Sequence, residues 1–278
     1  MVPDVGSSIQ PELGTAGLTQ TLQNSDQSTL LVMPTGSGKT WTARRSLAWW
    51  AEKGFLSIYL SPLKALAQEQ VSTLKREFPQ LRVGLFTGEV AENPREADIL
   101  VATHEKFDIY LKRPKLHLDW LARIGVVVVD EIHLLADAQR GGRLESLLVR
   151  LQEVNPFVQI LGLSATLTNA DELSAWLRGQ VIKGGTRPVP LETEFVRYKT
   201  EAQKQEQVLT ILTEGRSQGG QTLIFVATRR RAEAVETWLR EQGWRVRHHH
   251  SGLWPQERQE IEGAFRAGHV EVLTQSSG

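Results

Sequence analysis

The stretch Pro34-Thr35-Gly36-Ser37-Gly38-Lys39-Thr40 follows an apolar run and precedes a stretch with helical spacing. Residues 29–33 have the composition of a buried strand, and residues 40–53 place apolar side chains on one helical face until Gly54. Glycines between a strand and a helix let backbone N–H groups turn towards phosphate oxygens, and the helix N-terminus adds positive partial charge. This order of elements therefore predicts a phosphate-binding loop.

The side chains of this loop have expected tasks. The Lys39 amine reaches the β and γ phosphates of ATP, and the Thr40 hydroxyl is a ligand of Mg²⁺. The strict pattern has glycine at position 33, where this chain has Met33, a change that relaxed forms of the loop tolerate. The expected nucleotide-binding set is Thr35, Gly36, Ser37, Gly38, Lys39 and Thr40.

Further short apolar runs alternate with helical stretches after the loop. Residues 56–60, 99–102, 125–129 and 158–163 have the composition of buried strands, and residues 63–78 have that of a helix. Such alternation is typical of an α/β fold with a parallel sheet and helices on both faces. Ligands bind at the carboxyl ends of the strands in these folds, so polar residues after each strand are candidate site residues.

Two adjacent carboxylates end the most apolar of these strands. Asp130 and Glu131 follow four valines and begin the sequence Asp130-Glu131-Ile132-His133. Carboxylates at the end of a buried strand are costly unless they bind a partner or take part in chemistry. We expect Asp130 to hold Mg²⁺, directly or through water, and Glu131 to deprotonate the water that attacks ATP. With Lys39 they form the expected catalytic set.

Residues 184–190 are rich in glycine and proline and are typical of a linker. We expect an ATP-binding domain over residues 1–186 and a second α/β domain, about half as long, over residues 187–278. Residues 191–196 alternate like an exposed strand. The second domain then has expected helices from residue 201, at 230–241 and at 255–267, and expected strands at 222–227, 245–249 and 270–273.

Together these motifs resemble those of superfamily two DExH-box helicases. Ser164-Ala165-Thr166 follows the acidic motif as in that family, and looser similarities lie in residues 61–66, 87–89, 103–107, 225–229 and 249–253. Residues 140–145 and 187–191 are similar to the Ski-like branch, which holds repair DNA helicases and exosome-associated RNA helicases, with Lhr-type helicases as a near alternative. The resemblance covers roughly residues 25–278 and implies tandem RecA-like lobes, the second of them incomplete.

The resemblance also implies where nucleic acid binds and how binding is linked to ATP. The nucleotide pocket would be connected to the strand-binding surface by His133, Ser164 and Thr166. The strand would be held through its phosphates, with little sequence preference, by Pro62, Lys64, Thr103 and His104 in the first lobe and by Thr228, Arg229, Ser251 and Gly252 in the second. The implied partner is single-stranded or forked nucleic acid, DNA favoured over RNA, and the implied cofactors are ATP and Mg²⁺.

Three departures from the family pattern change these expectations. The glutamine that reads adenine has no convincing match, with Gln10 and Gln20 as candidates. The sequence ends at residues 274–278, where motif V would begin, and motif VI with its arginine finger would follow later. We therefore expect an exposed sheet edge after residues 270–273, ATP binding with weak hydrolysis at most, and no separation of duplex strands.

Composition excludes several other classes of protein. Lys and Arg together number 32, as do Asp and Glu, so nucleic acid would be held by local basic groups rather than by net charge. The absence of cysteine excludes disulfides, thiolate metal sites and cysteine nucleophiles. With no secretory signal and no apolar run long enough to span a bilayer, we expect a cytoplasmic protein that does not enter membranes.

Several alternatives remain open. The chain is either a motor enzyme or an ATP-gated nucleic-acid-binding module with little turnover, while the ordered motifs argue against a small-molecule kinase. Residues 229–231 either grip phosphates or form a solvated helix start. Residues 248–250 are three histidines that suggest a metal site, but consecutive strand residues point to alternate faces, so we favour a strand end beside the nucleic-acid path.

Overall fold

The carboxyl end of β1 (Ser28–Val32) leads into the glycine-rich loop, and α2 (Lys39–Glu52) begins directly after the loop. The strand, loop and helix order predicted from the sequence is thereby confirmed. The computed structural model describes residues 15–23, 25, 27–88, 92–184, 187 and 189–276. Gln10, Glu89, residues 185, 186 and 188 of the expected linker, and residues 277 and 278 lie outside them. The chain divides into two units between Leu191 and Glu192, which we call lobe one and lobe two.

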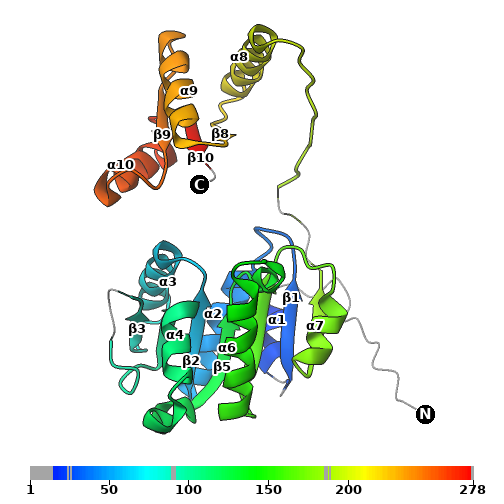
Figure 1. The fold of residues 1–278 in the computed structure, drawn as a ribbon, viewed down its shortest axis with the longest axis vertical. Coiled ribbons are helices and arrows are strands. Elements are labelled where there is room, and N and C mark those ends of the chain that lie inside the picture. The colour runs from blue at the N-terminus through cyan, green and yellow to red at the C-terminus, as the bar shows by residue number, and fades with distance from the viewer. Residues whose placement is uncertain are drawn as a thin grey trace, which may run out of the picture. The chain divides into compact units, whose positions relative to one another are not determined.

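Lobe one is built on a parallel sheet (Figure 1). Among the described residues it has seven strands, in the order β3-β4-β2-β5-β6-β1-β7. Parallel neighbours need a crossover connection, which explains the alternation of strands and helices along the sequence. β2 pairs with β4 and β5, and β1 pairs with β6 and β7. The other strands are β2 (Leu56–Ser61), β3 (Val83–Phe86), β4 (Ile99–Thr103), β5 (Ile124–Val129), β6 (Gln159–Ser164) and β7 (Gly179–Lys183).

Helices cover both faces of this sheet (Figure 1). Val126 and Val128 of β5 point into one core cluster and Val127 and Val129 into the other, because successive strand side chains face opposite sides. The first cluster is closed by α1 (Thr15–Gln23), α2 and α3 (Lys64–Glu77). The second is closed by α4 (His104–Leu111), α5 (Leu118–Leu121), α6 (Gly141–Val154) and α7 (Ala170–Trp176), with the short 3-10 helices η1 (Pro114–Leu116) and η2 (Ile132–Ala136) between them in the chain.

Lobe two also has a parallel sheet, with three strands among the residues described there, in the order β8-β10-β9. Its small core gathers Leu212, Leu239, Trp244, Val246 and Val272. The elements are α8 (Glu201–Ser217), β8 (Thr222–Val226), α9 (Arg229–Glu241), β9 (Val246–His249), α10 (Pro255–Arg266) and β10 (Val272–Ser276). The predicted α/β class with two parallel-sheet lobes is confirmed.

Two expectations for lobe two are wrong. Residues 191–196 form no strand, because alternation alone does not supply the neighbouring strand with which a backbone must pair. The last strand is also not an edge of the sheet. β10 lies between β8 and β9, since the α9 crossover leaves a gap of one strand that β10 fills. The edges are therefore β8 and β9.

Among the described helices, none combines the length and the apolar composition needed to cross a membrane.

Candidate nucleotide and nucleic-acid sites

The glycine-rich loop turns sharply at Gly36 and Gly38, whose φ angles are 83° and 92°. These lie in the left-handed region that glycine adopts without a steric penalty. The loop is tied to itself, since the Ser37 hydroxyl donates to the Pro34 carbonyl at 2.6 Å. A Cβ at Gly38 would lie 2.6 Å from Thr15 Cγ2, so the start of α1 closes against the loop. Thr15 is a neighbour of the loop that the sequence did not indicate.

The Lys39 amine points back into its own loop. Its Nζ donates to the carbonyls of Met33 and Pro34, the latter at 2.9 Å. Burial lowers the pKa of this amine, while the charges of Glu131 and Asp130 raise it. The surroundings of Met33 explain why a bulky residue is tolerated where the strict loop pattern has glycine. Its side chain is buried in the core, and its N–H donates to the Ser164 carbonyl at 3.1 Å.

Asp130 is held in place by two donors. The Tyr59 hydroxyl donates to Asp130 Oδ2 at 2.6 Å, and the Glu131 N–H donates to Oδ1 at 3.0 Å. Burial, together with the charge of Asp130 next to it, raises the pKa of Tyr59 well above its usual value, so this hydroxyl stays a neutral donor. Tyr59 is fully buried on β2 and lies 71 positions from Asp130, which is why no local pattern indicates it.

Glu131 has a left-handed backbone, with φ of 51°. Such a conformation costs a non-glycine residue about 1–3 kcal/mol and commonly marks a functional site. It turns Glu131 towards His133, whose Nδ1 lies 3.2 Å from Glu131 Oε2. Both side chains are close to half exposed, at 45% and 42%, so a bound water or nucleotide can reach them.

His133 links Glu131 to the end of β6. Its Nδ1 also lies 3.3 Å from Ser164 Oγ. The Ser164 hydroxyl donates to the Thr166 carbonyl at 2.7 Å and accepts from the Thr166 N–H at 3.2 Å. The residues expected to couple the nucleotide pocket to the strand-binding surface therefore form one chain of polar contacts that begins at Glu131.

The four lobe-one residues expected to hold nucleic acid gather around Pro62. Pro62, Lys64 and Thr103 line one cleft of about 360 Å³. Pro62 and His104 line a neighbouring cleft of about 260 Å³. Burial lowers the pKa of His104, and its Nε2 has no hydrogen-bond partner among the described residues. His104 is therefore a neutral ring with a polar atom still to be satisfied.

The same clefts are lined by cationic side chains that are not among the expected nucleic-acid residues. Lys106 lines the first cleft, and Arg140 and Arg143 line the second. A Cβ at Gly88, also in the first cleft, would lie 3.7 Å from Lys64 Nζ. Residues 140–145 are similar to a helicase branch, and that similarity could have indicated the two arginines.

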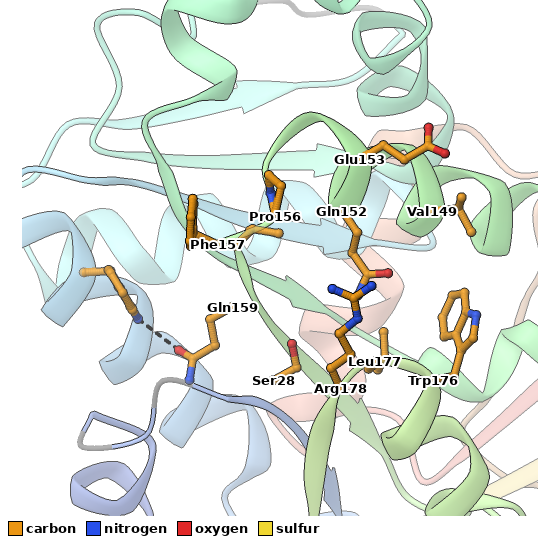
Figure 2. Close-up of a pocket in the computed structure, with 12 residues that line it drawn as sticks. Ser28, Val149, Gln152, Glu153, Pro156, Phe157, Gln159, Trp176, Leu177 and Arg178 are labelled. Atoms are coloured by element: carbon orange, nitrogen blue, oxygen red, sulfur yellow. Dashed lines mark hydrogen bonds between the residues drawn. The ribbon is translucent and has the colours of Figure 1, made fainter.

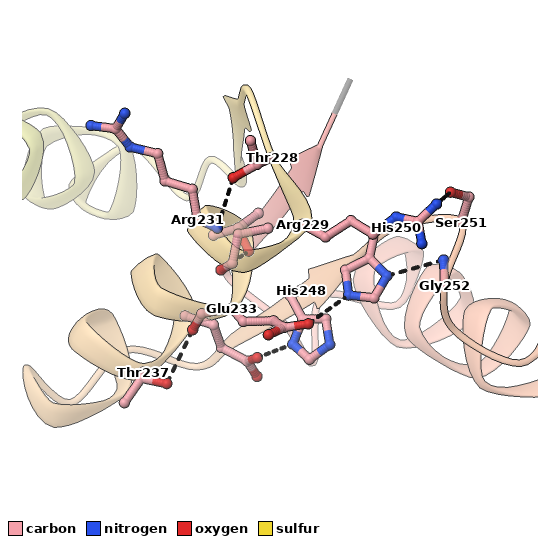
Figure 3. A network of polar contacts seen from close by, with 12 residues as sticks. Thr228, Arg229, Arg231, Glu233, Thr237, His248, His250, Ser251 and Gly252 are labelled. Atoms are coloured by element: carbon pink, nitrogen blue, oxygen red, sulfur yellow. Dashed lines mark hydrogen bonds and ion pairs between the residues drawn. The ribbon is translucent and has the colours of Figure 1, made fainter. Parts of the chain in front are cut away.

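In lobe two, three of the four expected nucleic-acid residues, Arg229, Ser251 and Gly252, lie at a turn after β9, shown in Figure 3. Arg229 Nη2 donates to Ser251 Oγ at 2.7 Å. The Gly252 N–H donates to His250 Nδ1 at 3.2 Å. Thr228 caps α9, its hydroxyl accepting from the Arg231 N–H at 3.3 Å. The cap gives Thr228 a structural task in addition to any contact with nucleic acid.

A further cleft of about 890 Å³ lies at the opposite edge of the lobe-one sheet, where β1 and β6 begin (Figure 2). Phe157 and Trp176 line it, and the Trp50 Nε1–H donates to Gln159 Oε1 at 3.1 Å beside it. Because parallel strands place ligands at their carboxyl ends, this cleft is not where the nucleotide is expected.

Of the two candidate adenine readers, Gln20 is exposed on α1.

Comparisons with known proteins agree with this geometry. The model of the DEAD/DEAH box helicase family matches residues 15–173, and the model of the helicase conserved C-terminal domain matches residues 203–277. The ATP-dependent DNA helicase Hel308 of Thermoplasma volcanium is 31% identical over 281 residues, covering 88% of this chain and 41% of that protein. Hel308 of Aeropyrum pernix is 32% identical over 295 residues, covering 88% and 39%. The chain thus spans about two fifths of the length of these relatives.

Solved structures show the same fold. The DUF1998 helicase MrfA bound to DNA superposes with a TM-score of 0.77 at 21% identity, covering 95% of this chain and 42% of that one. The Mycobacterium smegmatis helicase Lhr bound to ssDNA and AMP-PNP gives 0.68 at 23% identity, covering 96% and 40%. The two parallel-sheet lobes are thus the tandem RecA-like lobes that the sequence predicts. On its family match, the chain belongs to the DEAD/DEAH box helicase family.

Proposed function

We propose that this chain binds ATP·Mg²⁺ at the carboxyl edge of the lobe-one sheet and hydrolyses it in response to single-stranded nucleic acid. The observation that supports this most is the chain of contacts from Glu131 through His133 to Ser164 and Thr166. These contacts join Glu131, the candidate general base, to Ser164 at the carboxyl end of β6, the neighbour of β5 in the sheet. A change at one end can therefore reposition the other.

The nucleotide is held by the loop and by its lysine. Lys39 leaves the Met33 and Pro34 carbonyls and turns to the β and γ phosphates, while the loop amides surround them. The Thr40 hydroxyl and the Asp130 carboxylate are oxygen donors of the kind that Mg²⁺ prefers, so the residues present fit this ion. When bound, Mg²⁺ neutralises charge on the phosphate oxygens.

Glu131 takes the proton of the attacking water. Its half-exposed carboxylate is aimed by the left-handed backbone and by His133, 3.2 Å away. Phosphoryl transfer depends mainly on positioning and charge neutralisation, so an acceptor in a fixed place is the part that the protein must supply. Tyr59 keeps the neighbouring Asp130 from turning away.

Single strands bind through their phosphates to the Pro62 clefts of lobe one and to the Arg229–Ser251 turn of lobe two. We favour DNA over RNA because the two Hel308 relatives described above are named as DNA helicases. For the whole protein, the function that fits these sites is ATP-driven movement along DNA during repair. An ATP-gated binding module with little turnover is the alternative.

Steady-state ATP hydrolysis by the purified chain, with and without an excess of single-stranded DNA, separates these functions. We expect the DNA to raise the rate several-fold, and RNA of the same sequence to raise it less. If the chain binds ATP and single-stranded DNA but hydrolyses ATP at the same rate with DNA, with RNA and with neither, the binding module would be favoured.

A further inference from the structure

Two of the three consecutive histidines converge on one side of β9, where Figure 3 shows them facing α9. His248 belongs to β9 and His250 directly follows the strand, and residues two positions apart in an extended chain point to the same side. Their rings stack with centroids 5.0 Å apart and planes 20° apart. His249 faces the other way and pairs with Glu262 of α10, its Nε2 lying 2.9 Å from Oε1.

The facing surface of α9 brings two carboxylates to the paired rings. Glu233 Oε1 lies 3.1 Å from His250 Nε2, and Glu236 Oε2 contacts His248 Nδ1. Glu236 also pairs with Arg240, one turn further along the helix. The three-residue separation of Glu233 and Glu236 places both on the same side of α9. Strand and helix thus supply two imidazoles and two carboxylates to one spot.

Three of these groups are close enough to share one ion. One ligand atom each from Glu233, His248 and His250 lies within 4.8 Å of the others. Ligands of a tetrahedral zinc ion lie about 3.3 Å apart, which follows from bond lengths of about 2.0–2.1 Å. We expect rotations of these three side chains to close the difference.

We propose that Glu233, His248 and His250 form a binding site for a zinc-class divalent ion. Two imidazoles and one carboxylate are ligands that zinc takes up readily, with a fourth position left to water. Glu236 supplies the outer contact common in such sites, a carboxylate that accepts from the non-ligating nitrogen of a ligating histidine. Its side chain is only 7% exposed, so this contact is fixed by the fold.

The charges around the cluster are balanced, and the access route fits a small ion. Glu233 and Glu236 bring two negative charges, of which Arg240 offsets one, and Arg229 reaches the turn through Ser251. The Glu233 side chain is 53% exposed, whereas that of His250 is 7% exposed. An ion can therefore enter from solvent past Glu233 and meet the two rings behind it.

Loading of the site has one structural consequence. Because His250 Nδ1 accepts from the Gly252 N–H, the ring proton lies on Nε2 and is donated to Glu233. An ion on Nε2 takes the place of that proton, and the proton moves to Nδ1, where it faces the Gly252 amide. The amide must then turn away. Ser251 and Gly252 are exposed, so the turn can rearrange while water satisfies the freed group.

Cobalt(II), the spectroscopic substitute for zinc, tests the site in the full chain without nucleotide. We expect one equivalent to give the visible absorption of four-coordinate cobalt, and added zinc to remove it. His248→Ala and Glu233→Gln should each weaken cobalt binding by about tenfold or more. The matched controls are His249→Ala and Glu262→Gln, which change the same residue types on the other side of β9 and should bind as the unaltered chain does.

Equal cobalt affinity in the unaltered chain and in Glu233→Gln, or an equal loss in the His249→Ala control, would overturn the site. Far-ultraviolet circular dichroism of each variant shows whether the chain is still folded. Glu233 is exposed, so its glutamine variant keeps the test decisive even if His248→Ala disturbs the fold.

Discussion

The sheets of the two lobes differ in how completely they are covered. Every residue of β5 in lobe one is buried, because helices pack on both faces. In β8 of lobe two the exposure alternates, and Leu223 and Phe225 are 47% and 64% exposed. Polar residues at the end of β5 thus stand on a rigid base, whereas those at the end of β8 stand on a strand with one open face.

The candidate sites reflect this difference. Asp130 is fixed by Tyr59 from a neighbouring buried strand. The contact of Arg229 with Ser251 joins two exposed side chains, and exposed contacts of this kind contribute little to stability. The geometry around Asp130 is therefore fixed by buried contacts, whereas the contacts of the lobe-two turn are exposed and can change.

The largest expected effect is on stability, and it compares the two sheets directly. Ile58→Ala on β2, where Ile58 is fully buried, should lower the free energy of unfolding of lobe one by about 2–5 kcal/mol. Leu223→Ala on β8 removes a half-exposed side chain and should cost under about 1 kcal/mol in lobe two. Urea denaturation followed by circular dichroism measures both. Equal losses would mean that coverage does not distinguish the sheets.

The next effect concerns the nucleotide. Lys39→Ala removes the charged donor of the loop and should weaken ATP binding roughly tenfold to 100-fold, the scale of hydrogen bonds to charged groups. Lys53→Ala, after the end of the same helix, is the control and should leave binding unchanged. Calorimetric titration gives the affinities. If the Lys39 variant binds ATP as tightly as the unaltered chain, the loop is not the phosphate site.

The smallest effect is expected at the lobe-two turn. Arg229→Ala should weaken single-stranded DNA binding a few-fold and reduce the slope of log affinity against log salt by about 1. Arg230→Ala removes the same charge one position along α9 and should change the slope less, because Arg229 is the residue that contacts Ser251. Fluorescence anisotropy at several salt concentrations distinguishes them. A larger loss from Arg230→Ala would place the strand elsewhere.

The sequence predicted the interior of the lobe-one fold better than its borders. The four valines before Asp130 and the strand before Gly36 are continuous apolar runs, the pattern of strands covered on both faces. The sequence did not indicate β3 and β7, which are the two edge strands of the sheet and have weaker apolar patterns. In β7 most residues are only half buried. Residues 191–196 show the opposite error, a pattern without a partner strand.

The candidate site divides in the same way. The positions of Lys39, Asp130 and Glu131 follow from local motifs with fixed spacing. Contacts that need the tertiary fold could not be predicted, such as Tyr59 with Asp130. The same holds for the approach of Glu233 to His250, where a strand meets a helix. Alternation correctly separates His249 from its neighbours, but it cannot show which helix the other two face.

Glu131→Gln tests the central claim most directly, because it keeps the shape of the side chain and removes its basicity. We predict that ATP affinity is unchanged, while ATP hydrolysis in the presence of single-stranded DNA falls by a factor on the order of 10² or more. The control is Glu153→Gln, an exposed glutamate on α6 far from the loop, which should hydrolyse ATP at the rate of the unaltered chain. Undiminished hydrolysis in Glu131→Gln would show that another group activates the water, and would contradict the account.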